Sequence, residues 1–498
     1  MDEPVVFSKV VEKARSAFES GFTKPVEFRK QQLRRLVDLL DENEELLYEA
    51  AYKDMGKSRY ETYFVDTHMS RNEVIEALQN VGKWMKPEYP KVDLALRISS
   101  VSVRKEPYGV CMILGSWNFP FLLTITPLVS AIAAGNCAVV KPSEFAPNCA
   151  KLIRDLIPKY LNQDCYPVVL TDTEGSAKLL NENKFDLIFY TGGANGGRQV
   201  MIAATKHLTP FVLELGGKNP CVVHRSSDLM TSARRLCNGK YLNNGQVCIS
   251  PDYVLCDEAV KDEFLECLKK NLVQFFGENM SKSPDISRIV NDRHFQRVQK
   301  LLNSGKVVFG GEYNAKERYI APTILTDVPE NSPVMKEEIF GPILPIFSVK
   351  NVDEAIQKIN EGEKPLALYI FSRDKAITQK ILDNTSSGGV AVNDTLIHFN
   401  HFQPFGGVGQ SGIGNYHGKY GFDTFSHQRS VFVNKTPDVF LSFRYPPYAK
   451  RNVDTLRLLK KRIPTGRPSG IAMMLGIGAI GAATAYTYKK LYSESTNK

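Results

Sequence analysis

The chain lacks closely spaced cysteines. Nine cysteines occur among its 498 residues, and no two of them stand in a CxxC or CxxxC pattern. Structural zinc sites and the disulfide frameworks of small secreted domains both depend on such pairs, so the sequence indicates neither. A signal peptide is also missing, because the N-terminal stretch MDEPVVFSKVVEKARSAFES is patterned as an amphipathic helix and carries acidic residues at positions 2 and 3. We therefore expect the folded part to work in a reducing compartment.

No run of one charge accompanies the formal net charge of +9, because lysine and arginine are interspersed with acidic residues along most of the chain. Nucleic-acid-binding surfaces need clustered basic residues, so we expect no nucleic-acid partner. Hydrophobic residues make up 43% and charged residues 23%, which excludes both a disordered chain and a membrane protein with many spans. The length allows two domains with sizeable cores, which favours an enzyme over a small binding module.

The order of apolar segments predicts an α/β protein with two domains. The first hundred residues have mostly helical spacing, and from residue 104 onwards short apolar runs alternate with helical stretches. This alternation is typical of parallel sheets with crossover helices, and a domain boundary near 214–217 fits it. The runs that we predict as strands are VCMILG at 110–115, CAVVKP at 137–142, PVVLTD at 167–172, DLIFYTGG at 186–193 and PFVLELGG at 210–217, followed after Cys248 by YVLCD, KVVFGG, ILPIFSV, ALYIFS and GGVAVND.

The C-terminal segment differs in kind from the rest. Residues 444–468 are basic and interrupted by prolines, and the 18 residues at 471–488, IAMMLGIGAIGAATAYTY, contain no charge. As a helix this stretch is about 27 Å long, which suits a thin bilayer such as the endoplasmic reticulum. We predict a single-pass tail anchor with the catalytic part on the cytosolic side, since basic residues precede the span. The mitochondrial outer membrane, peroxisomes and a buried or interfacial helix stay open as alternatives, because glycines lower the hydrophobicity.

Residues 110–144 have the pattern of the first βαβ step in a nucleotide-binding sheet. The strand VCMILG leads through SWNFP into a helical stretch and then into CAVVKPSE. Lys141 and Glu144 stand at the end of that second strand, where ligands bind in such sheets. An acidic residue there accepts hydrogen bonds from the adenosine ribose and repels a 2′-phosphate, so NAD is favoured over NADP. Taken alone, KPSE is also compatible with a polar turn.

A glycine-rich turn follows the predicted strand DLIFYTGG. Residues 192–197, GGANGG, open a helical stretch whose backbone N–H groups can approach a pyrophosphate closely. The glycines of this turn are Gly192, Gly193, Gly196 and Gly197. The literal GxGxxG pattern lies at 407–412, but it follows Pro404 and Phe405 instead of a strand. We interpret this second pattern as a glycine-rich loop without a phosphate-binding role.

Three polar residues match the needs of cysteine-based acyl chemistry. A cysteine nucleophile needs a thiolate, hydrogen-bond donors for the oxyanion that it creates, and a base that activates water. Cys248 in NNGQVCIS, Glu214 in ELGGKNP and Asn118 in SWNFP supply these groups. Each residue by itself is also compatible with a structural role, such as a buried thiol or a surface carboxylate. Spacing alone does not decide between the two interpretations.

Over residues 1–435 the chain resembles the aldehyde dehydrogenase superfamily. The motifs that carry the resemblance are, in order, SWNFP, KPSE, ELGGKNP, GQVC, EEIFGP, AVND and PFGGVGQSG. The resemblance implies that Cys248 is the nucleophile, that Glu214 activates the hydrolytic water, and that Asn118 forms the oxyanion hole with the backbone N–H of Cys248. The implied reaction is thiohemiacetal formation, hydride transfer to NAD and hydrolysis of the thioester, and it requires no metal.

The same resemblance assigns the cofactor contacts. The matching residues are Lys141 and Glu144 for the adenosine ribose, 192–197 for the pyrophosphate, and Glu338 and Phe340 for the nicotinamide ribose and ring. Gly193 and Ala194 replace the Ser-Thr that is common in the family. This departure removes hydroxyl groups and no backbone donors, so it bears on cofactor affinity and not on the fold.

The ending NYHGKYGFDTFSHQRSV is similar to the class 3 branch, and the basic segment with its hydrophobic tail is similar to the membrane-anchored fatty aldehyde dehydrogenases of that branch. The resemblance implies a homodimer that exchanges strands. It also implies medium- to long-chain aliphatic aldehydes as substrates, which partition into lipid. The predicted division is a Rossmann-like NAD-binding domain at 1–96 and 107–213, a catalytic domain at 214–428, oligomerisation arms at 97–106 and 429–435, a basic linker at 444–470 and a transmembrane anchor at 471–488.

Two other functions stay open. Coenzyme A could replace water as the acyl acceptor, although Glu214 argues for hydrolysis. The protein could also be a catalytically silent, membrane-tethered structural or interaction subunit, although such proteins tend to lose the nucleophile or the base. His417 and His427 could line the substrate mouth or serve a structural role.

Overall fold

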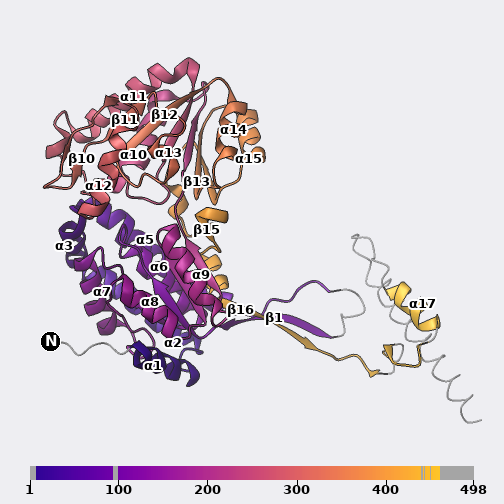
Figure 1. The fold of residues 1–498 in the computed structure, drawn as a ribbon. Coiled ribbons are helices and arrows are strands. Elements are labelled where there is room, and N and C mark those ends of the chain that lie inside the picture. The colour runs from indigo at the N-terminus through magenta and orange to yellow at the C-terminus, as the bar shows by residue number, and fades with distance from the viewer. Residues whose placement is uncertain (1–6, 93–98, 439–440, 442–443, 449, 460–498) are drawn as a thin grey trace, which may run out of the picture. The chain divides into compact units, whose positions relative to one another are not determined.

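The computed structural model describes residues 7–92, 99–438, 441, 444–448 and 450–459. The chain divides into two compact units. The first comprises Met1–Trp84 and Glu106–His427, and the second comprises Met85–Lys105 and Gln428–Lys498. The first unit is built on a five-stranded and a seven-stranded sheet, each with helices packed around it (Figure 1). The predicted α/β fold with two sheets is therefore confirmed.

The five-stranded sheet has the strand order β15-β5-β4-β2-β3. Its strands are β2 (Val110–Leu114), β3 (Cys137–Lys141), β4 (Leu187–Thr191), β5 (Phe211–Glu214) and β15 (Gly412–Ile413). All neighbours pair in parallel except β15, which runs antiparallel to β5. Every residue of β2 and of β3 is buried, as expected for a parallel sheet covered on both faces, even though β3 lies at the edge of the sheet.

The strand predicted at 167–172 is wrong. Only Val168 pairs with the sheet, through an isolated bridge to Val140 in β3. The chain then turns at once, because the side chain of Asp172 accepts a hydrogen bond from the Gly175 N–H at 2.8 Å and caps a helix. The apolar run is therefore too short to continue as a strand before this cap.

The helices of this half surround the sheet. They are α1 (Phe7–Glu19), α2 (Val26–Glu42), α3 (Glu44–Met55), α4 (Arg59–Glu61), the π-helix η1 (Thr62–His68), α5 (Met69–Trp84), α6 (Leu122–Ala134), α7 (Pro147–Tyr160), α8 (Thr173–Glu182), α9 (Ala194–Thr205) and α16 (Gly418–Thr424). All 13 residues of α6 are buried, because α2, α5 and α16 cover the sides that β2 and β3 do not. A helix in that position must be apolar all round.

The seven-stranded sheet has the order β14-β13-β6-β7-β12-β11-β8 and is parallel except for β8. Its strands are β6 (Pro220–Val223), β7 (Tyr253–Asp257), β8 (Lys306–Phe309), β11 (Thr323–Thr326), β12 (Ile343–Val349), β13 (Ala367–Phe371) and β14 (Gly389–Val392). Its helices are α10 (Leu229–Tyr241), α11 (Lys261–Phe276), α12 (Asp292–Leu301), α13 (Pro333–Lys336), α14 (Val352–Glu361) and α15 (Lys375–Asn384), and β9 (Tyr313–Asn314) pairs with β10 (Tyr319–Ile320) beside them. The five predicted strands of this block are confirmed, whereas β6 and β11, of four residues each, were not predicted.

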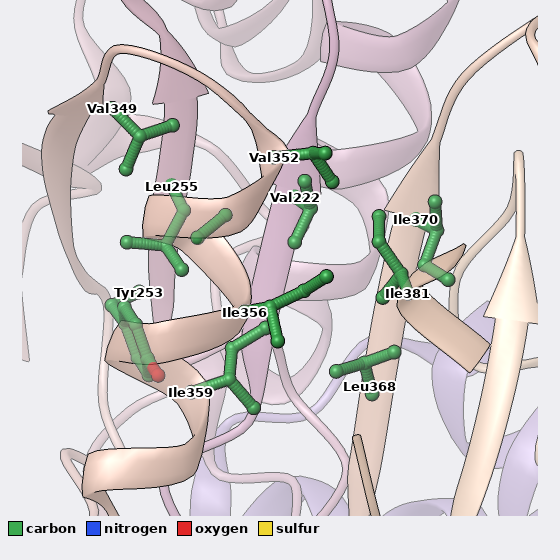
Figure 2. Packing of buried hydrophobic residues seen from close by; sticks show 11 residues of the cluster. Val222, Tyr253, Leu255, Val349, Val352, Ile356, Ile359, Leu368, Ile370 and Ile381 are labelled. Atoms are coloured by element: carbon green, nitrogen blue, oxygen red, sulfur yellow. The ribbon is translucent and has the colours of Figure 1, made fainter. Parts of the chain in front are cut away.

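One face of this sheet packs against α14 and α15. Figure 2 shows Val222, Leu255 and Ile370 of the strands beside Ile356 of α14 and Ile381 of α15, all buried. Apolar residues at 352, 355, 356 and 359 recur at helical spacing and give α14 its buried face. This packing anchors β6, the strand that directly follows the ELGGKNP loop.

The second unit contains most of β1 (Ser100–Pro107) and of β16 (Ser426–Val433), which pair in a two-stranded sheet, and α17 (Lys450–Leu459). These strands coincide with most of the predicted arms at 97–106 and 429–435, while strand exchange between two subunits stays a prediction. The predicted anchor at 471–488 and the last part of the basic linker lie outside the described residues. Among the helices that the structure does describe, none has the length and apolar character needed to cross a bilayer.

Candidate active site

A cavity of about 910 Å³ opens inside the first unit, where loops that follow strands of both sheets face each other. Seven predicted site residues line it: Asn118, Gly192, Gly193, Glu214, Cys248, Glu338 and Phe340. Lys141, Glu144, Gly196 and Gly197 do not line it, and neither do His417 and His427. His417 instead pairs with the buried Glu73, at 3.1 Å between Nδ1 and Oε2. Asn118 and Phe340, which are 222 positions apart in the sequence, therefore meet in a single cavity.

Cys248 follows a tight loop at the end of α10. Asn243, Asn244 and Gly245 all have left-handed backbone angles, with φ of 47°, 53° and 76°. A side chain at Gly245 would overlap the carbonyl oxygen of Gly341, so this turn requires glycine. The loop carries Cys248 to the cavity wall, and it is the only one of the nine cysteines, all within the described residues, that is not fully buried. The prediction that the other cysteines belong to the core is consistent with their burial.

The surroundings of Cys248 favour the protonated thiol over the thiolate. Burial raises its pKa well above the ordinary value, and the nearby carboxyl groups of Glu338 and Glu214 raise it further. Hydrogen bonds from the backbone N–H groups of Ile249 and Cys248 to the sulfur act in the opposite direction. Formation of the nucleophilic thiolate therefore requires a proton acceptor in the cavity.

Glu214 ends strand β5 and is 2% exposed. Neither of its carboxylate oxygens has a hydrogen-bond partner in the part of the chain that the structure describes. Burial raises the pKa of this carboxyl well above its ordinary range. Because none of the described residues donates a hydrogen bond to it, the ionised form of Glu214 is a strong base for any water molecule beside it.

The 407–412 loop holds the strand that carries Glu214. Gly412 pairs with Glu214 across the antiparallel β15–β5 ladder, and the Leu215 N–H donates to the carbonyl of Ser411 at 3.1 Å. Gly412 has φ of 152°, and a Cβ there would overlap the carbonyl oxygen of Leu213. Gly407 and Gly412 thus serve close backbone packing, and the interpretation that this loop has no phosphate-binding role stays a prediction.

Glu338 and Phe340 form a further part of the cavity wall. Burial raises the pKa of Glu338 to about 8, and repulsion by Asp252 adds to this shift. A Cβ at Gly216 would overlap the carboxyl group of Glu338, so the first glycine of ELGGKNP leaves room for it. The ring of Phe340 meets that of Trp117 edge to face, with centroids 5.3 Å apart. The apolar ring of Phe340 and the carboxyl group of Glu338 therefore line the same cavity as Cys248.

Asn118 lies in the loop after β2 and is 2% exposed. Its side-chain nitrogen donates one hydrogen bond, to the carbonyl of Gln246 at 3.1 Å. A primary amide has two hydrogens, so one donor is left for an oxygen bound at Cys248. This arrangement fits an oxyanion hole whose donor is already oriented before substrate arrives.

Two site residues had no predicted role. The Asn219 side chain donates to the carbonyls of Cys248 at 2.8 Å and Ser250 at 2.9 Å, which fixes the nucleophile loop. Lys240 is fully buried, its Nζ lacks a hydrogen-bond partner among the described residues, and burial lowers its pKa to about 8. Asn219 stands inside ELGGKNP and was recognisable as part of a motif. Nothing in the sequence indicated that Lys240 is buried, because a single lysine in a helix is ordinarily exposed.

The predicted cofactor residues have a charge and a backbone geometry that fit NAD. Burial raises the pKa of Glu144, but hydrogen bonds from Lys141 and Thr173 outweigh it, and the net pKa lies below the ordinary value. Glu144 is therefore an ionised acceptor suited to ribose hydroxyls and opposed to a phosphate. The turn before α9 presents open helix N–H groups, and a Cβ at Gly192 or Gly196 would collide with the Tyr190 hydroxyl. These residues fit the adenosine ribose and the pyrophosphate.

Known proteins share this organisation. Residues 4–431 match the aldehyde dehydrogenase family. Aldehyde dehydrogenase family 3 member A2 from Mus musculus is 46% identical over 480 residues, covering 96% of this chain and 98% of that protein. The substrate-bound structure of Staphylococcus aureus AldH aligns with a TM-score of 0.88 and 40% identity, over 92% of this chain and 100% of that chain. An indole-3-acetaldehyde dehydrogenase in complex with NAD⁺ aligns with a TM-score of 0.79 and 26% identity, over 86% and 88% of the two chains.

Proposed function

The chain belongs to the aldehyde dehydrogenase family, and from this premise we propose how its residues oxidise an aldehyde and which aldehydes they accept. The protein is an aldehyde-oxidising oxidoreductase, and NAD is its expected cofactor. The proposed substrates are medium- to long-chain aliphatic aldehydes, which become carboxylic acids. One observation carries the mechanism: Cys248, the cysteine that reaches the cavity, shares its wall with Asn118 and Glu214.

The first step forms a covalent bond between the enzyme and the substrate. The Cys248 sulfur attacks the carbonyl carbon after its proton passes to a base, and the carbonyl oxygen becomes an oxyanion. The free hydrogen of the Asn118 amide and the backbone N–H of Cys248 stabilise this charge. Lys141, Glu144 and the turn at 192–197 would hold NAD, which would supply the acceptor for the hydride that leaves the same carbon. The carbon–hydrogen bond breaks with its electron pair, and a thioester on Cys248 remains.

The second step releases the acid. Glu214 accepts a proton from water, whose oxygen attacks the thioester carbon, and the carbon–sulfur bond breaks to return the Cys248 thiolate. The raised pKa of Glu214 makes it a better proton acceptor than an exposed carboxylate. This role favours water over coenzyme A as the acyl acceptor. The three intact chemical groups likewise weigh against a silent scaffold.

The substrate class and the location are inferred from the C-terminal sequence. The uncharged stretch 471–488, preceded by basic residues, supports a single-pass anchor in the endoplasmic reticulum with the catalytic part facing the cytosol. An apolar aldehyde dissolved in the bilayer reaches a tethered site at a raised local concentration. The high coverage of family 3 member A2 supports the same branch. We further propose a homodimer through the arms at 97–106 and 429–435, with NAD-binding and catalytic domains divided near 214.

The test is NADH formation by the purified full chain in lipid vesicles, with hexanal and hexadecanal as substrates. We expect activity with both, higher kcat/KM for the longer aldehyde, and none in Cys248→Ser. The control is Cys237→Ser, a buried cysteine outside the cavity, which should keep activity. NADH formation that needs added coenzyme A would favour the other acceptor. No NADH with any aldehyde, or an active Cys248→Ser enzyme, would refute the proposal.

A further inference from the structure

A buried charge network lies on the side of the cavity wall where Asn118 stands. Lys57 and Asp66 have no exposed side-chain surface, and Lys57 Nζ lies 2.9 Å from Asp66 Oδ2. The same ammonium group donates to the backbone carbonyl of Asn118 at 2.8 Å and lies 4.3 Å from the centre of the Phe119 ring. A buried ammonium thus binds the main chain of the residue that supplies the oxyanion donor.

Asp66 extends the contact along the same loop. Its Oδ1 accepts hydrogen bonds from the backbone N–H groups of Phe121 at 3.3 Å and Leu122 at 3.4 Å, at the start of α6. The carboxylate therefore holds the far end of the loop while Lys57 holds Asn118. A charged acceptor at a helix N-terminus is well placed for this role.

Glu61 reaches the nucleophile loop from the same segment. Its carboxylate accepts from the Asn243 backbone N–H at 2.9 Å and from the Ser287 hydroxyl at 3.0 Å. Glu61 and Asp66 are five residues apart at the π-helix η1, whose hydrogen bonds run from residue i to i+5. A π-turn therefore brings both carboxylates to the same side, which an α-helix would not do.

Asn243 joins the two loops. Its side-chain nitrogen donates to the carbonyl of Asn118 at 3.0 Å and to the carbonyl of Gln246 at 3.2 Å. The Asn118 amide donates to that same Gln246 carbonyl. The oxyanion donor and the loop of Cys248 are thus tied to each other and, through Lys57 and Glu61, to one short helical segment.

We propose that Lys57, Asp66 and Glu61 are positioning residues that fix the Asn118 amide relative to Cys248, so that its second hydrogen points at the developing oxyanion. The partners of these residues carry the argument, because most are main-chain atoms of the two catalytic loops. A pair that served only to stabilise the fold would need no contact with these loops. The inference rests on the proposed role of Asn118.

The test is a double-mutant cycle on the rate constant of the NADH burst, which reports steps up to hydride transfer. We expect Asn118→Ala to slow the burst about 100-fold, the usual effect of losing an oxyanion donor. Lys57→Met should slow it about tenfold. In the Asn118→Ala background, Lys57→Met should slow it less than twofold further, because the amide that it positions is gone. The burst amplitude separately gives the fraction of folded, active enzyme.

Matched variants keep the test decisive. Arg29→Met removes another buried cation, which donates to the carbonyl of Ala133 at 2.9 Å but does not contact Asn118, and should leave the burst rate unchanged. If Lys57→Met does not fold, Asp66→Asn takes its place, since the amide oxygen still accepts from Phe121 and Leu122. Equal slowing by Lys57→Met with and without Asn118 would overturn the positioning role. An unaffected Asn118→Ala burst would instead refute the proposed oxyanion hole, and the inference with it.

Discussion

Two buried polar regions border Cys248, and they are built differently. On the oxyanion side, the charged groups of Lys57, Asp66 and Glu61 all have hydrogen-bond partners, and so does the Asn118 amide nitrogen. On the base side, partners within the described residues are missing for both oxygens of Glu214, for Glu338 Oε1 and for Lys240 Nζ. The oxyanion side is not complete either, because the amide oxygens of Asn243 and Asn244 also lack partners.

The difference follows from what each side must do. A donor for a developing charge works best if it does not move, so its supports are satisfied within the protein. The groups on the base side must bind water and a cofactor that enter and leave the site. Their polar atoms therefore stay without partners among the described residues. An unpaired buried polar group costs about 1–3 kcal/mol of stability, which proteins tolerate mainly at functional sites. Burial is the largest cause of the raised pKa of Glu214 and of the pKa of about 8 for both Glu338 and Lys240, and the missing partners leave this burial uncompensated.

The largest expected effect comes from the base side. Glu214→Gln should lower steady-state turnover about 100- to 1000-fold while the first NADH burst remains, because the proposed role of Glu214 is to activate the water that hydrolyses the thioester. Stopped-flow and steady-state measurements on one preparation separate the two steps. Loss of the burst together with turnover would show that Glu214 acts before hydrolysis.

Stability should respond in the reverse order. Lys57→Met leaves the buried Asp66 carboxylate and the Asn118 carbonyl without their cation, and breaking such a pair costs about 3–5 kcal/mol. Glu214→Gln removes no hydrogen bond among the described residues, so its thermal midpoint should match the wild type. Thermal unfolding of both variants tests this contrast. A large loss of stability in Glu214→Gln would mean that partners outside the described residues hold that carboxylate.

The pH dependence of hydrolysis sharpens the comparison further. Glu214 acts as a base only when ionised, and its pKa is raised, so the rate of thioester hydrolysis should increase with pH through a range well above 4.5, the ordinary value. Below that range the rate should fall about tenfold per pH unit. In Glu214→Gln the rate of thioester hydrolysis should no longer increase with pH in this range. If the wild-type hydrolysis rate instead increased with pH around the ordinary pKa of glutamate, Glu214 would be accessible to solvent during catalysis.

The sequence predicted the base side better than the oxyanion side. Cys248, Glu214 and Glu338 each stand in a recognisable motif, and the strands that carry or neighbour them were expected in an α/β fold. Lys57, Glu61 and Asp66 stand in no motif, and their partners are main-chain atoms 55 to 182 positions away. Such contacts depend on how η1 packs against the loops, which apolar periodicity does not encode. The short strands β6 and β11 were not predicted for a similar reason. Their strand conformation depends on pairing with neighbouring strands more than on their own four residues.

The cofactor residues extend the base side, and Glu144 tests their selectivity. Glu144→Gln removes the charge that opposes a 2′-phosphate while keeping an acceptor for the ribose. We expect the ratio of kcat/KM for NADP to that for NAD to rise about tenfold, a change of about 1.4 kcal/mol. Initial rates with both cofactors measure this ratio. An unchanged ratio would mean that another residue excludes the phosphate.

The smallest effect is expected at the turn that departs from the family pattern. Gly193 has open space where a Cβ would stand and φ of −76°, so Gly193→Ser adds a hydroxyl without strain. One extra hydrogen bond to the pyrophosphate, about 0.5–1.5 kcal/mol, should lower the KM for NAD roughly two- to tenfold. The matched control is Gly192→Ser, whose Cβ would collide with the Tyr190 hydroxyl and should weaken binding instead. If Gly193→Ser left the KM unchanged, the pyrophosphate would lie beyond its reach, and backbone N–H groups alone would hold the cofactor on this side of the cavity.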